Sequence, residues 1–146
     1  MNDENFLSSC LFFNTNAFSR QLLKLAEAAF HPLKLSPSHA SLLLQVYDAP
    51  GITPKELSAL LHLTPSTITR FIDALVKKKL VRRRSKGKIT QIFPTGRSLK
   101  IQGDVANAYK TLVLSYTEIL GMEGALQLSE QIEQATQRVA SAQGNP

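Results

Sequence analysis

A run of small hydroxyl side chains followed by one arginine, between Thr64 and Arg70, carries the clearest chemical signal in the chain. Thr64-Pro65 is a typical helix start, in which the threonine caps the helix and the proline occupies its first turn. Small polar residues at a helix N-terminus allow close approach to a duplex, and the positive end of the helix dipole favours phosphate. An arginine here can reach a guanine edge or a phosphate. We therefore assign Thr64 to capping and predict DNA contacts for Pro65, Ser66, Thr67, Thr69 and Arg70.

A second group of cationic residues follows around a glycine. Two β-compatible runs, 80–84 and 89–93, flank the predicted turn Ser85-Lys86-Gly87-Lys88. Strand alternation sends Arg82 and Arg84 to one face of this hairpin and Arg83 to the other. The lysines of the tip are suited to entering a minor groove or to straddling its phosphates. The predicted DNA contacts of the hairpin are Arg82, Arg83, Arg84, Lys86 and Lys88.

The positive charge of the chain is concentrated in this region. Residues 53–100 hold twelve Lys and Arg against Glu56 and Asp73, a net charge of +10, whereas the rest holds five basic and nine acidic residues, a net charge of −4. Such asymmetry is typical of a protein that neutralises backbone phosphates and releases their counterions.

The elements that position these residues read as mainly helical. Apolar periodicity predicts a long helix over 6–30 that ends at His31-Pro32, and a second helix from Ser36-Pro37 to about Tyr47. Thr53, Pro54 and Glu56 form a helix start with a capping box, and Leu57, Leu60 and Leu61 supply its apolar face. A three-residue turn leads to the helix over 64–78, and two short helices so joined have the form of a helix-turn-helix.

After the hairpin, closed by Pro94, helix returns at Gly96, is interrupted by Gly121 and Gly124, and resumes to the C-terminal region. The predicted fold class is mainly α with a small β-hairpin wing (α+β): a winged helix-turn-helix between long N- and C-terminal dimerisation helices. The predicted parts are residues 1–35, 36–96 and 97–146.

The segment from Thr53 to Gly96 resembles the MarR family of bacterial regulators. The resemblance rests on Pro54-Lys55-Glu56-Leu57-Ser58, on the run from Leu63 to Leu75, and on Leu80-Val81-Arg82-Arg83. It implies a homodimer that binds palindromic double-stranded DNA as a transcriptional regulator, in particular a repressor. The recognition helix, about 64–78, would lie in the major groove and the wing, about 81–93, on the minor groove.

Two features depart from the family pattern. Lys79 stands where the family has glycine, so either a non-glycine residue is left-handed there or the helix ends differently. The tip Lys86-Gly87-Lys88 lacks the acidic residue that orients a wing arginine in the family. Asp73 is then expected to pair with Arg82, with Arg84 or with Lys77.

Regulators of this kind respond to small molecules or oxidants, which directs attention to a few further residues. Cys10 is the candidate redox sensor, although the alternative is a cysteine packed at the dimer interface. An aromatic set could line an effector pocket, with ordinary core packing as its alternative: Phe13, Phe18, His39 and Tyr47. The histidines share no metal-ligand spacing, and neither a metal nor another cofactor is expected.

The sequence gives less support to the other classes of function. An enzyme is not expected, because the sequence has no nucleophile–base pair, glycine-rich phosphate loop or metal motif. RNA binding would require stacking aromatics that the basic segment lacks. The main alternative is a winged-helix protein–protein interaction module without DNA binding. With no long apolar run and an acidic N-terminus, we expect a cytoplasmic protein without a membrane segment.

Overall fold

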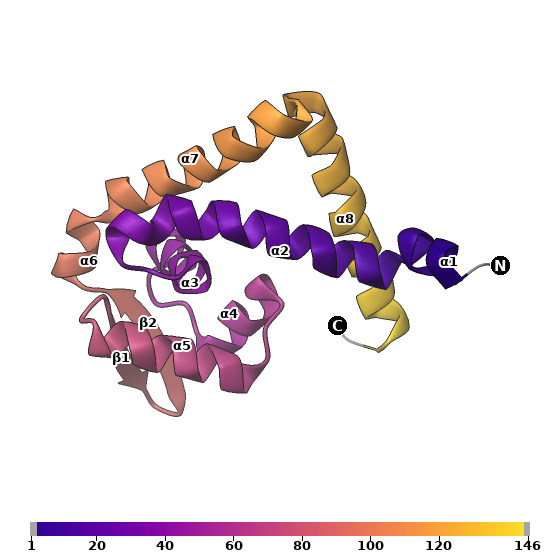
Figure 1. Cartoon of the computed structure of the whole chain (residues 1–146). Helices are drawn as coiled ribbons and strands as arrows, with labels where there is room; N and C mark the ends of the chain where they lie inside the picture. The colour runs from indigo at the N-terminus through magenta and orange to yellow at the C-terminus, as the bar shows by residue number, and fades with distance from the viewer. Residues whose placement is uncertain (1–2, 145–146) are drawn as a thin grey trace. The chain divides into compact units, whose positions relative to one another are not determined.

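The computed structural model describes residues 3–144 and consists of helices with one β-hairpin (Figure 1). The chain forms two compact units, of which the first ends at Tyr109 and the second begins at Lys110. The first unit contains α1 (Asp3–Ser9), α2 (Leu11–Phe30), a 3₁₀ turn (His31–Leu33), α3 (Pro37–Asp48), α4 (Pro54–Leu61), α5 (Pro65–Lys77), β1 (Val81–Lys86), β2 (Ile89–Pro94), α6 (Gly96–Lys100) and the start of α7 (Gln102–Leu120). This order confirms the predicted fold class. The sequence-based divisions at 35/36 and 96/97 both fall inside the first unit.

The N-terminal helix is divided in two, contrary to the single helix predicted over 6–30. Cys10 is extended, with φ −78° and ψ 115°, and acts as the N-cap residue of α2. The Asn14 side chain spans the break, because its Nδ2 donates to the Ser8 carbonyl at 2.9 Å. The end of α2 at Phe30 agrees with the prediction, but not for the expected reason. His31 before the proline remains helical, and the chain turns away at Lys34, which is left-handed with φ 54°.

Helix α3 supplies much of the hydrophobic core of the first unit. Its Ala40, Leu42, Leu43 and Val46 are fully buried, and the helix contacts α2, α4, α5 and β2. Ser36 caps it as predicted, since its hydroxyl accepts a hydrogen bond from His39 N at 3.1 Å. The core therefore lies directly behind the two short helices of the motif.

Both helix starts of the helix-turn-helix form as predicted. The Thr53 hydroxyl accepts from Glu56 N at 3.2 Å while the Glu56 carboxylate accepts from Thr53 N at 2.8 Å, which completes the capping box. The hydrogen bonds that the Glu56 carboxylate accepts, first from Thr53 N and then from Thr53 Oγ1, lower the pKa of Glu56. On α4 only part of the predicted apolar face is buried, because Leu57 is inaccessible whereas Leu60 is exposed. On α5 the residues Ile68, Ile72 and Leu75 are buried, and this stripe places α5 on the core.

The hairpin has a tighter turn than expected. Lys86 pairs with Ile89, so Ser85 and Lys86 belong to β1 and only Gly87 and Lys88 form the loop. Gly87 has φ +62°, the positive value that the first loop residue of such a hairpin adopts. A third extended segment was not predicted: Ile52 O accepts from Ile92 N at 2.9 Å, and Gly51 N donates to Ile92 O at 2.8 Å. This bridge ties the base of the wing to the loop before α4.

The second unit consists of the end of α7 and of α8 (Met122–Ala142). Gly121, with φ +78°, separates the two helices as predicted, whereas Gly124 lies inside α8 and does not interrupt it. In the first unit, the helix that the sequence predicts from Gly96 onward is divided in two, because Ile101 separates α6 from α7. Several large apolar side chains of this unit are exposed, including Ile119, Leu126, Ile132 and Val139.

Candidate nucleic-acid interface

The N-terminal turns of α5 carry a connected set of exposed or half-buried hydroxyl groups. The Thr64 Oγ1 lies 3.2 Å from Ser66 Oγ, donates to Thr67 Oγ1 at 2.9 Å and accepts from Thr67 N at 3.3 Å. The predicted capping role of Thr64 is therefore present, together with a side-chain network around it. The Thr69 hydroxyl turns back to the Pro65 carbonyl at 3.0 Å.

Arg70 joins this network from the next turn of the helix. Its Nη2 lies 3.4 Å from Thr67 Oγ1, and the arginine is exposed. Thr67 therefore accepts from Arg70 and from Thr64 at the same oxygen. Of the five predicted contact residues of α5, the polar ones are exposed or half-buried and form a polar surface away from the buried stripe: Ser66, Thr67, Thr69 and Arg70.

The connection from α5 to the wing passes through a left-handed residue. Lys79 has φ 60°, its N–H donates to Val76 O at 2.9 Å, and Leu80 N donates to Leu75 O at 2.9 Å. This pair of hydrogen bonds closes a helix end around a position that favours glycine. Of the two possibilities raised by Lys79, the left-handed one is present. The Lys79 carbonyl also accepts a hydrogen bond from Thr95 Oγ1 at 2.7 Å, and this bond anchors the end of the hairpin.

The wing is attached to α5 by Arg83, which forms an ion pair and a hydrogen bond with Asp73. The expected partners of Asp73 were Arg82, Arg84 and Lys77, so that expectation is wrong. The reason is the strand alternation itself, because the single arginine on the other face of β1 is the one that meets α5, against which β1 packs. Arg82 instead lies over the Phe93 ring, with 5.0 Å between its Cζ and the ring centroid.

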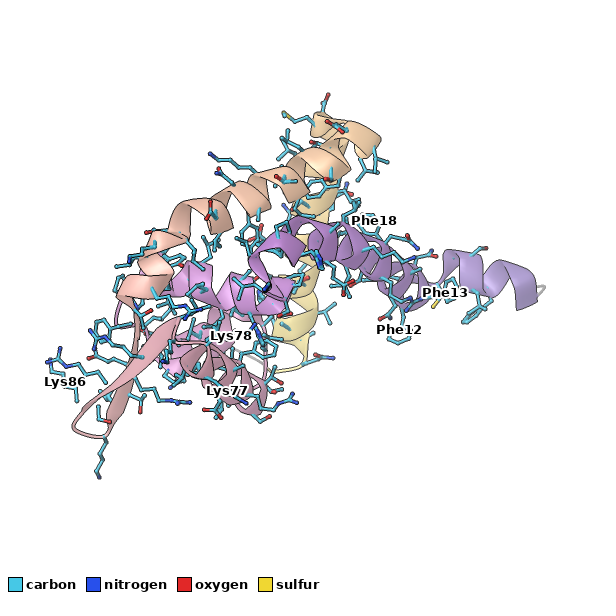
Figure 2. All side chains as sticks on the ribbon, turned by 60° about the vertical axis from the view of Figure 1, so that its left-hand side comes forward. Phe12, Phe13, Phe18, Lys77, Lys78 and Lys86 are labelled. Carbon is cyan, nitrogen blue, oxygen red and sulfur yellow. The ribbon has the colours of Figure 1, made fainter. Side chains whose placement is uncertain are left out.

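The remaining predicted wing residues extend from the hairpin. Arg84, Lys86 and Lys88 are exposed, and Lys86 points away from the ribbon at the tip (Figure 2). Ile89 at the start of β2 is exposed as well, whereas Ile92 near its base is inaccessible. The wing therefore combines a buried base with an exposed cationic tip.

The four aromatic residues proposed for an effector pocket have separate surroundings. Tyr47 is buried and donates to Ser98 O at 2.6 Å, and burial raises the pKa of its phenol. His39 packs edge-on against Phe71, with 4.9 Å between ring centroids, and its Nδ1 is buried without a partner among the described residues. Desolvation, with nearby Lys78 as a second cause, lowers the pKa of His39. Phe13 and Phe18 lie on successive turns of α2 (Figure 2). No hydrogen bond or ring contact found among the described residues joins the four.

Several further features bear on the predictions of partners and cofactors. Cys10 is half-buried and free, at the break between α1 and α2. Within residues 3–144, no group of three or more His, Cys, Asp or Glu side chains is arranged to hold a metal ion. None of the described helices is both long and apolar enough to cross a bilayer.

One contact at this surface was not foreseen from the sequence. Lys78 Nζ donates to the Lys34 carbonyl at 2.9 Å, so the end of α5 is fixed to the left-handed turn after α2. No spacing rule could reveal this pair, because the two lysines are far apart in the chain. Lys77, its neighbour, is exposed (Figure 2).

A helix-turn-helix followed directly by a basic two-stranded hairpin defines a winged helix-turn-helix protein. The model of the MarR family matches residues 35–87, which confirms the resemblance noted in the sequence. No curated protein matches the chain.

Solved structures show the same fold over most of the chain. A MarR protein from Peptoclostridium difficile is 19% identical with a TM-score of 0.78, covering 90% of this chain and 88% of its own. The transcriptional repressor CouR bound to p-coumaroyl-CoA is 20% identical with a TM-score of 0.79, covering 93% and 98%. A mutant MarR from E. coli complexed with operator DNA is 20% identical with a TM-score of 0.77, covering 86% and 92%. The fold of the chain is that of MarR-family regulators.

Proposed function

We propose that this protein is a DNA-binding transcriptional regulator that acts as a homodimer on palindromic duplex DNA, as a repressor. The observation that carries the proposal is the polar surface formed by Ser66, Thr67, Thr69 and Arg70 on α5, next to a wing with an exposed cationic tip. In this arrangement α5 enters the major groove and the wing reaches the minor groove. The net charge of +10 over residues 53–100 supplies attraction to phosphate along the whole surface.

The contacts within this surface support different roles for its arginines. Arg70 is exposed on α5 and its Nη2 donates to the Thr67 hydroxyl, so the other donors of the guanidinium can reach a base edge. Arg84 and the tip lysines are exposed and suited to phosphates. Arg83 is already paired with Asp73, which makes it the weakest candidate of the ten for a direct contact.

Exposed apolar side chains support the homodimer. In α8, Leu128, Ile132, Ala135 and Val139 follow the spacing of one helix face, and Ile132 and Val139 are 44% and 56% exposed. In the N-terminal helices, Phe6, Leu7, Leu11, Phe12 and Phe13 are also exposed. Apolar faces of this kind in both end regions are typical of surfaces that become buried on association.

We also propose that a small molecule controls DNA binding. The likeness to CouR, a repressor whose solved structure holds p-coumaroyl-CoA, supports this part of the proposal. Phe13, Phe18, His39 and Tyr47 remain the predicted lining of the effector site, and Cys10 remains the predicted redox-sensitive residue, with packing as the alternative for each. A thermal-shift screen against phenolic acids, acyl-CoA thioesters and peroxide tests both, with Cys10→Ser as the control for the oxidant.

The central experiment measures binding to a palindromic duplex that is selected from a randomised library, by fluorescence anisotropy over a range of salt concentrations. We expect Arg70→Ala to weaken binding by about 1–3 kcal/mol, since it removes one specific contact. Arg20→Ala is the matched control, because Arg20 is an exposed arginine on α2 outside the basic region, and it should leave affinity unchanged.

Circular dichroism and sedimentation establish that each variant keeps its helicity and its oligomeric state. Binding that is indifferent both to Arg70→Ala and to replacement of Lys86 and Lys88 by alanine would overturn the proposal. A protein that selects no duplex at all would instead favour the winged-helix protein–protein interaction module.

A further inference from the structure

An aromatic ring lies beside one of the predicted DNA contacts at the base of the wing. Arg82 of β1 is paired with Phe93 of β2 in the register of the hairpin. Side chains directly opposite each other on antiparallel strands share one face of the sheet, with about 4.5–5.5 Å between their Cβ atoms. The Arg82 guanidinium lies over the ring, with 5.0 Å between its Cζ and the ring centroid. The ring quadrupole attracts this positive charge, so the contact restricts the long arginine side chain.

The Phe93 ring is also supported by the loop before α4. Ile52 forms a bridge with Ile92, so this loop follows the edge of β2 that is not paired with β1. Gly51 in the loop has φ +92°, and a Cβ atom added to it would lie 3.2 Å from Phe93 Cζ. The absence of a side chain at Gly51 therefore allows the ring to lie against the loop backbone. Phe93 is held between Arg82 of one neighbouring strand and Gly51 beside the other edge, which limits movement of the ring away from the guanidinium.

The charge of Arg82 is not neutralised by the wing itself. Residues 81–94 contain no aspartate or glutamate, and Asp73 of α5 pairs with Arg83 on the opposite face of β1. Stacking occupies the flat face of a guanidinium and leaves the N–H groups at its edge to donate. Because Arg82 is exposed, these donors can reach a phosphate oxygen while the stacking on the ring is kept.

We infer that Phe93 is a positioning residue for Arg82, an inference that rests on the proposed function. The ring holds the guanidinium in the geometry in which its edge contacts a backbone phosphate of the duplex. The arginine is then ordered before DNA binds, so binding costs less conformational entropy than it would with a mobile side chain. Arg84 lies on the same face of the hairpin but is opposite Gln91, which offers no aromatic ring, so Arg84 lacks this support.

The test is a double-mutant cycle on the affinity for the selected duplex, measured for Phe93→Leu, Arg82→Gln and the variant that carries both. Phe93→Leu keeps an apolar side chain at this half-buried position and removes the ring. We expect it to weaken binding by about fivefold, the factor that corresponds to about 1 kcal/mol for ordering one long side chain. In the Arg82→Gln background, the same substitution should change the affinity by less than about twofold, because no guanidinium is left to position.

The salt dependence of binding separates the roles of the two residues. Arg82→Gln removes a phosphate contact, so the slope of log affinity against log salt concentration should become shallower by about 0.9. Phe93→Leu removes no charge, so the affinity should fall while the slope stays the same. A role of Phe93 in stability alone predicts instead that its substitution has the same effect whether or not Arg82 is present.

Arg84→Gln is the matched control, because it removes a cation from the same face of the same strand. Its effect and that of Phe93→Leu should add, since Arg84 is not opposite Phe93. Circular dichroism and thermal melting establish that each variant is folded.

The inference is overturned if Phe93→Leu keeps the affinity of the unaltered protein, or weakens binding equally with and without Arg82. It is also overturned if Arg82→Gln leaves the salt slope unchanged, because Arg82 then contacts no phosphate. Failure of the unaltered protein to bind any selected duplex overturns the proposed function, and this inference with it.

Discussion

The recognition helix and the wing are held in the protein by different means. Helix α5 is attached along its length, through the buried stripe of Ile68, Ile72 and Leu75, and hydrogen bonds close both of its ends. In the wing, β1 is buried only at its first residue, Val81, and β2 only at Ile92. Beyond this base, the hairpin is tied back by Arg83 to Asp73, with Arg82 over Phe93.

This difference matches the role that the proposed function gives to each element. Contacts that discriminate between bases depend on donors held in a fixed geometry, and holding them before binding reduces the entropy lost on binding. Contacts to phosphate depend mainly on charge and tolerate adjustment. Under the proposed function, the firmly packed helix α5 suits the first kind of contact, and a wing fixed at its base with an exposed tip suits the second.

The largest effect is expected at the base of the wing. Ile92→Ala removes a fully buried side chain from β2 at the bridge to Ile52, so the free energy of unfolding should fall by about 2–5 kcal/mol. Chemical denaturation followed by circular dichroism measures the change. Ile89→Ala is the matched control on the same strand, because Ile89 is 56% exposed, and it should cost less than about 1 kcal/mol. Equal losses from the two variants would mean that the tip is as firmly packed as the base.

The sequence predicted those parts of the site that depend on neighbouring residues. Thr53 and Thr64 could be recognised as caps because their partners lie three positions away, and the alternating sides of β1 followed from strand geometry. The buried positions of α5 followed from helical spacing. Local rules were sufficient for these features.

The predictions that were wrong or missing mostly concern contacts between segments that are distant in the sequence. The Asp73–Arg83 pair depends on how β1 packs against α5, and the bridge at Ile52 depends on a loop that passes β2. Leu60 continues the apolar spacing of α4, yet it is 56% exposed, because the spacing along one helix does not show which side the rest of the core covers. The break at Cys10 was missed because the apolar pattern continues across it while the Asn14 amide satisfies the Ser8 carbonyl.

A smaller effect is expected at Lys79, which joins the helix to the wing. A left-handed conformation strains any residue with a Cβ atom, whereas glycine adopts it freely at the cost of greater entropy in the unfolded chain. Lys79→Gly should therefore stabilise the protein by about 0.5–1 kcal/mol in chemical denaturation. Lys79→Ala serves as the control, because it removes the charge but keeps the Cβ atom, and it should bring no comparable gain. A loss of stability in Lys79→Gly would show that the junction does not depend on backbone strain.

The smallest effect on stability is expected where the wing meets the helix, at Arg83 and Asp73. Both side chains are substantially exposed, at 39% and 59%, so solvent screens the pair and its loss should cost less than about 1 kcal/mol of unfolding free energy. The effect of losing this pair on DNA binding shows whether Arg83 only holds the wing against α5 or contacts DNA directly. If Arg83 serves mainly to hold the wing, Arg83→Gln should change the salt dependence of binding very little, whereas Arg84→Gln should lower the slope by about 0.9, the value of one phosphate contact. Asp73→Asn should release Arg83 toward the phosphates and raise the slope. If Arg83→Gln instead lowers the slope as much as Arg84→Gln does, Arg83 contacts DNA directly, and the distinction between the two faces of β1 fails.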